Sequence, residues 1–221
     1  MKTSLYRWFW FIAGIIVNSF GIAFITKASL GTSPISSVPY VLSFQIPFSF
    51  GQVSFLVNML FILGQIILLK SKFKPVQFLQ IAVNVLFSAC IDWSMAFLSW
   101  LNPDSPVTCF LSLLTGCVIL ALGISIEVAP QVLYVPGEGI VNAIASVSRK
   151  KFSTVKVCFD VTLIATAAIL SLLFFSRLRG LGIGTLISAL LVGKITGFFH
   201  KRLPLVSQLE NLAVFSYSNP A

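Results

Sequence analysis

Residues 27–46 read KASLGTSPISSVPYVLSFQI, a polar turn followed by an apolar run that begins at Pro34. The same arrangement recurs at residues 134–147, YVPGEGIVNAIASV, where a turn containing Pro136 precedes a second apolar run. A transmembrane helix needs about 20 consecutive, mostly apolar residues, and both runs are shorter than that. The sequence therefore predicts two short helices that do not cross a bilayer comfortably, over residues 34–46 and 137–147.

The rest of the chain is apolar enough to need a bilayer as its solvent. Of the 221 residues, 57% are hydrophobic and 10% are charged, and the mean hydropathy is +0.98. Soluble domains carry about 25% charged residues. Six further stretches are long enough to span, namely residues 8–26, 52–69, 75–97, 107–126, 155–175 and 181–199. We expect an all-α membrane protein with six transmembrane helices and two short re-entrant half-helices.

The distribution of lysine and arginine favours six spans over eight. Cytoplasmic loops carry an excess of these residues, and eight spans would divide them almost evenly between the two sides. With six spans, 10 of the 15 lie inside, two lie within spans, and three lie outside. The three outside are Lys27, Arg177 and Arg179. This distribution predicts cytoplasmic N- and C-termini, and it accounts for the net charge of +9 without a nucleic-acid partner.

An offset of 102 residues aligns the two halves of the chain. The matching pairs are Gly14 and Gly116, Gly21 and Gly123, Pro34 and Pro136, Phe50 and Phe152, and Asn58 and Asp160. Three spans per half is an odd number, so this 3+3 repeat would be inverted, as in many transporters whose interrupted helices meet near the midplane. The predicted units are a first half, 1–101, a second half, 102–200, and a loose cytoplasmic tail, 201–221. Eight spans would instead give parallel repeats.

Both short helices begin with residues that suit a binding site. Ser33 could cap the first helix ahead of Pro34, and the free N–H groups there would attract an anion. At the second helix, Glu138 lies between two glycines and is followed by Asn142. A carboxylate within a membrane is a candidate site for protons, cations or amines. The alternatives are an ordinary capped helix at the outer interface and a loop carboxylate in water.

A second group of candidates lies inside the predicted spans. Lys156 and Asp160 are four residues apart and share one helix face, where an ion pair would lower the cost of burying both. This pair either fixes the position of its helix or places Asp160 beside Glu138 in a substrate site. Asn58 is an uncharged polar residue in a span, and such residues more often bond a neighbouring helix than a ligand.

The last predicted span carries Lys194, the counterpart of Asp92 at the offset of 102 residues. The two would either pair across the axis of the repeat or lie at the interfaces. Gly193 and Gly197 have the G-x-x-x-G spacing of close helix contacts. His200 lies at the polar end of the span, where we expect it to face lipid headgroups.

Several short motifs resemble one known family through their order and spacing. They are Gly21-Ile22-Ala23, Gly31-Thr32-Ser33-Pro34, Phe50-Gly51-Gln52 at the start of the span with Asn58, and Gly182-Ile183-Gly184-Thr185 followed by Gly193. Over roughly residues 10–200 the chain is similar to the YczE/YitT group of bacterial multi-pass membrane proteins. The resemblance implies a bacterial cytoplasmic (inner) membrane protein. Members of the YczE type have been linked to production of secreted peptide or polyketide products, which implies neither catalytic residues nor a substrate here. Lys194 departs from the family, whose last span commonly closes with a polar or acidic residue.

The leading functional hypothesis is a small-solute permease, or the membrane subunit of a transporter. Its site would use Ser33, Asn58, Glu138, Asn142 and Asp160. The sequence shows no nucleophile–base pair and no metal-ligand spacing, so we expect no enzyme, cofactor or metal. One alternative is a non-transporting accessory protein that supports a biosynthetic or export partner. Another is a substrate-capture subunit of an energy-coupled importer. Beyond the lipid bilayer and an unknown small solute, a membrane protein partner or a second copy is compatible with these functions.

Overall fold

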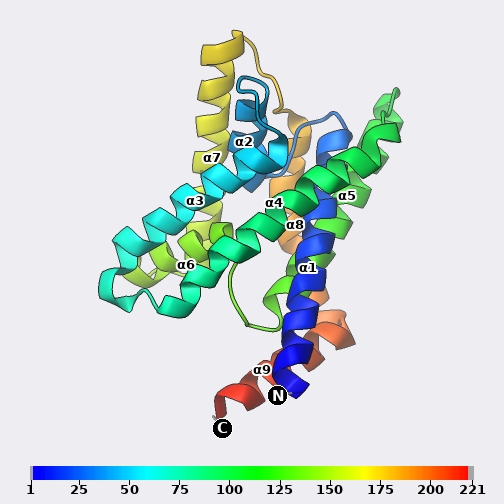
Figure 1. The fold of residues 1–221 in the computed structure, drawn as a ribbon. Helices are drawn as coiled ribbons and strands as arrows, with labels where there is room; N and C mark the ends of the chain where they lie inside the picture. Colours follow the sequence, from blue (N-terminus) through cyan, green and yellow to red (C-terminus); the bar gives the residue numbers. More distant parts are fainter. Residues whose placement is uncertain (1, 219–221) are drawn as a thin grey trace.

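The computed structural model describes residues 2–218, which form nine α-helices and three short 3-10 turns and contain no strand (Figure 1). The helices are α1 (Lys2–Lys27), α2 (Pro34–Ser43), α3 (Phe50–Leu69), α4 (Leu79–Phe97), α5 (Pro106–Val128), α6 (Pro136–Ser148), α7 (Phe152–Phe175), α8 (Ile183–Arg202) and α9 (Pro204–Ser218).

Six of these helices have the length and composition needed to cross a membrane, namely α1, α3, α4, α5, α7 and α8. The helix α2 has 10 residues and α6 has 13, so at 1.5 Å per residue they extend over about 15 Å and 20 Å. The hydrocarbon core of a bilayer is about 30 Å thick. The prediction of six long apolar helices and two short ones is therefore confirmed, although the first short helix ends at Ser43 rather than at residue 46.

The helices α1 and α5 form an antiparallel pair held together by glycines. The four contacts are Gly14 with Glu127, Gly116 with Ile25, Gly21 with Leu120, and Gly123 with Asn18. A Cβ atom on any of these glycines would come too close to the facing helix, so larger residues would force the two apart. The contacts are reciprocal at the offset of 102 residues, because Gly14 and Gly116 are counterparts and so are Ile25 and Glu127.

The other helices pack around this pair in matching ways, with one exception. The helix α4 packs on α1 and α8 packs on α5, while α3 packs on α6 and α7 packs on α2. Figure 1 shows α2 near one end of the molecule and α6 nearer the other. The helices α3 and α4 pack against each other, whereas their counterparts α7 and α8, all of whose residues the structure describes, make almost no contact.

Both short helices begin at a proline, which the first position of a helix accepts without losing a hydrogen bond. Ser33 occupies the N-cap position of α2, but its side chain makes no hydrogen bond to the N–H groups of that helix. Its Oγ atom donates instead to Ser36 Oγ at 3.0 Å. The prediction that the Ser33 side chain caps the helix is therefore wrong. The helices are buried where they face the long helices, as at Val41 and Val141.

The prediction of a loose tail is wrong for the part that the structure describes, because Pro204–Ser218 forms α9. Val206 and Leu209 on α9 are buried against Ala129, directly after α5. His200 Nδ1 and Glu210 Oε1 lie 2.7 Å apart and join α8 to α9. The first turns of α1 and the helix α9 lie at the same end of the molecule (Figure 1). Residues 219–221 of the predicted tail lie outside the described residues.

Candidate functional site

A cavity of about 610 Å³ lies between the two halves, and every helix from α1 to α8 contributes to its wall. Of the five predicted site residues, four line this cavity, namely Ser33, Asn58, Glu138 and Asp160. Asn142 lies one helical turn beyond Glu138 and is not on the wall. The structure thus brings together side chains that are more than 100 positions apart in the chain. Most of the wall is apolar, which is typical of a small-molecule site.

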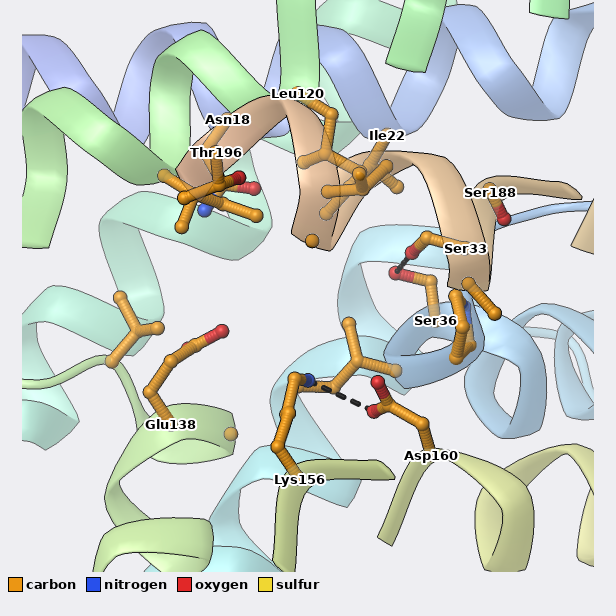
Figure 2. A pocket seen from close by; sticks show the side chains of 18 of the residues that line it. Asn18, Ile22, Ser33, Ser36, Leu120, Glu138, Lys156, Asp160, Ser188 and Thr196 are labelled. Atoms are coloured by element: carbon orange, nitrogen blue, oxygen red, sulfur yellow. Dashed lines mark hydrogen bonds and ion pairs between the residues drawn. The ribbon is translucent and has the colours of Figure 1, made fainter. Parts of the chain in front are cut away.

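Glu138 reaches the cavity from the first turn of α6. A Cβ atom on the neighbouring Gly139 would lie 2.7 Å from Gln65 Oε1, and one on Gly137 would meet Ile35. The two glycines therefore let the first turn of α6 fit closely against α2 and α3. The Glu138 side chain points into the cavity (Figure 2). Its Oε2 atom is shielded from solvent and has no hydrogen-bond partner among the described residues. An unpartnered buried oxygen is rare and needs an explanation.

Lys156 and Asp160 reach the cavity from α7, where they form an ion pair (Figure 2). Lys156 Nζ donates to Asp160 Oδ1 at 2.9 Å, and the two side chains are 27% and 16% exposed. Their spacing of four residues placed them on one helix face, and the structure turns that face towards the cavity. Because each charge has its opposite within contact distance, the pair adds little net charge to the wall.

Asn58 lines the cavity but uses its side chain to hold a neighbouring helix. Its Nδ2 atom donates to Asn84 Oδ1 on α4 at 2.8 Å, and Asn84 Nδ2 donates to the carbonyl oxygen of Phe55 at 3.0 Å. The amide groups of α3 and α4 are therefore joined to each other, as is common for uncharged polar residues in transmembrane helices. Asn58 shapes the wall more than it offers a free donor to a ligand.

Glu127 is the acidic residue that the sequence analysis missed. It is 2% exposed, and its Oε2 atom accepts a hydrogen bond of 2.6 Å from Asn18 Nδ2. Asn18 itself lines the cavity, so the Glu127 carboxyl group lies directly behind the wall. In the sequence, Glu127 ends an apolar run and looks like the polar boundary of a span. Only the pairing of α1 with α5 buries it.

The helix α8 contributes three polar side chains to the wall that the sequence analysis did not assign to the site, namely Ser188, Thr196 and His200. Thr196 lines the cavity, and its Oγ1 atom is buried without a hydrogen-bond partner among the described residues. His200 also lines the cavity and is bonded to Glu210, instead of being free to face headgroups as expected. A helical spacing of three to four residues from Gly193 would have placed Thr196 and His200 on a common face.

The start of α8 is fixed to the segment before α2. The N–H of Gly184 donates to the carbonyl oxygen of Leu30 at 2.9 Å, and the N–H of Thr32 donates to Thr185 Oγ1 at 3.2 Å. A Cβ atom on Gly184 would lie 2.7 Å from that carbonyl oxygen. The glycines at the start of α8 therefore allow its backbone to contact the backbone of the segment before α2. This contact keeps Ser33 beside α8.

The side chains that line the cavity limit the metal ions or cofactors that it could hold. Within residues 2–218, no three His, Cys, Asp or Glu side chains gather closely enough to hold a metal ion. The wall offers carboxyl, hydroxyl and amide groups, one imidazole, one lysine ammonium group and apolar carbon. Such groups can bind and orient a small molecule.

Comparison with known proteins identifies a family but no activity. A family model described as a family of unknown function, DUF6198, matches residues 5–201. Searches of curated proteins and of solved structures each found no match. The matched family does not confirm the resemblance to the YczE/YitT group.

Proposed function

We propose that this chain, which belongs to the DUF6198 family of unknown function, is a small-solute permease or the membrane subunit of a transporter. The observation that carries the proposal is the Glu138 carboxyl group, which points into a cavity of about 610 Å³ among membrane-type helices. Small-molecule sites commonly have volumes of about 300 to 1,000 Å³. An ionisable group that faces a cavity at membrane depth is typical of a substrate or ion pathway.

The antiparallel pairing of α1 with α5 supports an inverted repeat. These helices are counterparts at the offset of 102 residues, and their glycine contacts are reciprocal, as a twofold relation between the halves requires. In this arrangement, α2 and α6 are half-helices that dip into the membrane from opposite faces and meet beside the cavity. The termini are cytoplasmic, and the membrane is the bacterial inner membrane that the resemblance to the YczE/YitT group implies.

Cysteine labelling tests this topology. After replacement of the four native cysteines, single cysteines are placed at positions 48, 72, 104, 150 and 178. We expect reaction with an impermeant thiol reagent from the outside at 48, 104 and 178, and from the inside at 72 and 150. Reaction from the outside at position 72 would discard both the six-span topology and the inverted halves.

Transport is tested with the purified protein in proteoliposomes on a solid-supported membrane. The vesicles receive rapid pulses of amines, amino acids, carboxylates and sugars, and the charge movement is recorded. For any solute that gives a current, Glu138→Gln is expected to abolish it. The matched control is Asp104→Asn, the same chemical change at an exposed loop position, which should leave the current intact. Equal currents from wild type and Glu138→Gln would remove Glu138 from the proposed mechanism.

A further inference from the structure

The charges on the cavity wall do not balance. Glu138 and Asp160 each place a carboxyl group there, and Lys156 places an ammonium group. Lys156 is bonded to Asp160 at 2.9 Å, and His200 is bonded to Glu210 at 2.7 Å. Among the described residues that line the cavity, Glu138 is therefore the carboxyl group without an ion pair at contact distance, because the nearby Lys156 is bonded to Asp160. A ligand with one positive charge would balance the charge of Glu138.

Two residues that line the cavity each carry an oxygen atom that is buried without a hydrogen-bond partner among the described residues, Glu138 Oε2 on α6 and Thr196 Oγ1 on α8. Figure 2 shows Glu138 and Thr196 on different parts of the wall with open cavity beside them. Both atoms can accept a hydrogen bond. A protonated amine carries donors and a positive charge together, which suits a carboxyl oxygen and a hydroxyl oxygen that both lack a donor. A carboxylate or phosphate would instead face the charge of Glu138.

Most of the cavity wall is apolar. The apolar side chains on the wall include Ile22, Phe87, Leu120, Ile124 and Val192. A fully hydrated inorganic cation gains nothing from such a wall and would lose its hydration shell. An organic cation with an apolar body buries carbon surface there, which contributes about 25 cal/mol per Å².

The cavity opens between α7 and α8. Val157 on α7 and Gly193 on α8 both line it, and both are exposed. At 1.5 Å per residue, Val157 lies about 8 Å from the start of α7 and Gly193 about 14 Å from the end of α8. At Val157 and Gly193 the opening therefore lies within the apolar length of both helices, and the exposed residues Phe152 and Ser153 extend it to the start of α7. A molecule dissolved in the bilayer can reach it from the side.

We propose that the cavity binds an amphiphilic amine in its protonated form, which enters from the bilayer between α7 and α8. The ammonium group bonds Glu138 and Thr196, and the apolar body lies against the wall formed by α1, α4 and α5. This assignment rests on the proposed function and names its class of substrate.

The requirement for a cation is tested with three dansyl probes and the protein in lipid nanodiscs. Dansylcadaverine carries an amine, dansylamide is neutral, and dansylglycine carries a carboxylate. We expect saturable binding of dansylcadaverine alone, and a loss of affinity of about tenfold or more in Glu138→Gln, because a hydrogen bond to a charged group is removed. Asp104→Asn and empty nanodiscs are the controls. Equal binding of the neutral probe, or unchanged affinity in Glu138→Gln, would overturn the proposal.

The lateral route is tested with two matched variants of α8. A Cβ atom added at Gly193 or at Gly197 would have no heavy atom within 4 Å, so a side chain can be introduced at both positions. Gly193 lines the cavity and Gly197 does not. We expect Gly193→Trp to slow dansylcadaverine association several-fold in stopped-flow fluorescence and Gly197→Trp to leave it unchanged. Wild-type kinetics in both variants would exclude access between α7 and α8.

The two proposals fail in different ways. If dansylcadaverine binds through Glu138 but no solute produces a current in proteoliposomes, the permease assignment fails and the amine site remains. If another class of solute is transported and dansylcadaverine does not bind, the amine assignment fails and the permease remains.

Discussion

The helices α3 and α4 pack against each other, whereas their counterparts, α7 and α8, make almost no contact. Asp92 on α4 accepts hydrogen bonds from the N–H of Gly51 at 2.8 Å and from Ser49 Oγ at 2.5 Å, which fastens it to the start of α3. The counterparts of these three residues are Lys194, Ser153 and Lys151. Two lysines cannot form the same bonds, so the first half is joined where the second half is not. The expected alternative, in which Asp92 pairs with Lys194, is not what the structure shows.

Two further polar links distinguish the pairs. Asn58 bonds Asn84, and the side chains of Gln65 and Gln80 exchange two hydrogen bonds of 3.0 Å. At the offset of 102 residues, their counterparts are Asp160 with Leu186 and Ala167 with Gly182. Because the corresponding hydrogen bonds are absent between the described residues of α7 and α8, Asp160 faces the cavity together with Lys156. The polar residues between α3 and α4 therefore hold those two helices together, whereas Asp160 and Lys156 on α7 face the cavity.

The largest expected effect on stability comes from disrupting the close contact between Gly51 on α3 and Asp92 on α4. A Cβ atom at Gly51 would meet the Ser88 carbonyl oxygen and the Asp92 carboxyl group. We expect Gly51→Val to lower the free energy of unfolding by about 3 kcal/mol, the upper end of the usual cost of overpacking. Its counterpart change, Ser153→Val, lies at an exposed position and should cost almost nothing. Unfolding in mixed SDS micelles measures both, and equal stability of the two variants would contradict the comparison.

A smaller loss of stability is expected from removing the Asp92 carboxyl group. Asp92→Leu deletes both hydrogen bonds to the start of α3, at a cost of about 2 kcal/mol in the same unfolding assay. Lys194→Leu is the matched change on α8, where the exposed lysine has no carboxylate partner within residues 2–218. We expect Lys194→Leu to be neutral. A destabilisation as large as that of Asp92→Leu would show that Lys194 also fastens its helix.

Introducing between α7 and α8 the residues that join α3 to α4 should bring α7 and α8 together. The triple variant Lys151→Ser, Ser153→Gly and Lys194→Asp restores the three residues that hold α3 to α4. We expect it to narrow the opening and to weaken dansylcadaverine binding by about tenfold, or 1.4 kcal/mol. Spin labels at positions 157 and 190 report the distance between α7 and α8, which should shorten. An unchanged distance would mean that other contacts keep the two helices apart.

The smallest expected effect concerns two counterpart hydroxyl groups, Ser94 and Thr196. Both are buried without a hydrogen-bond partner among the described residues, but only Thr196 lines the cavity. Thr196→Val should weaken dansylcadaverine binding about threefold, the cost of one neutral hydrogen bond. Ser94→Ala should leave the affinity unchanged. Equal effects of the two changes would place the ammonium group away from Thr196.

Much of the site followed from local features of the chain. Three local features indicated residues that the structure brings to one cavity. They are the glycines beside Glu138, the proline at the start of each short helix, and the spacing of four between Lys156 and Asp160. Asn142 was assigned to the site and lies off its wall, because the side of α6 that faces the cavity depends on how α3 packs against that helix. Glu127 was missed for a similar reason, since its burial depends on Asn18 and Gly14, more than 100 positions away.

The sequence by itself determined the number of long apolar helices and the presence of two short ones, and it predicted an offset of 102 residues between the two halves. Hydropathy, length and proline positions are properties of single segments, so no partner is needed to recognise them. Only the tertiary structure decided that α3 and α4 close while α7 and α8 remain apart. It also decided which carboxyl group is left unpaired. Both outcomes depend on pairs of side chains that meet only after the helices pack. A hydrogen bond or an ion pair forms only when both partners are in contact, so one segment alone does not reveal it.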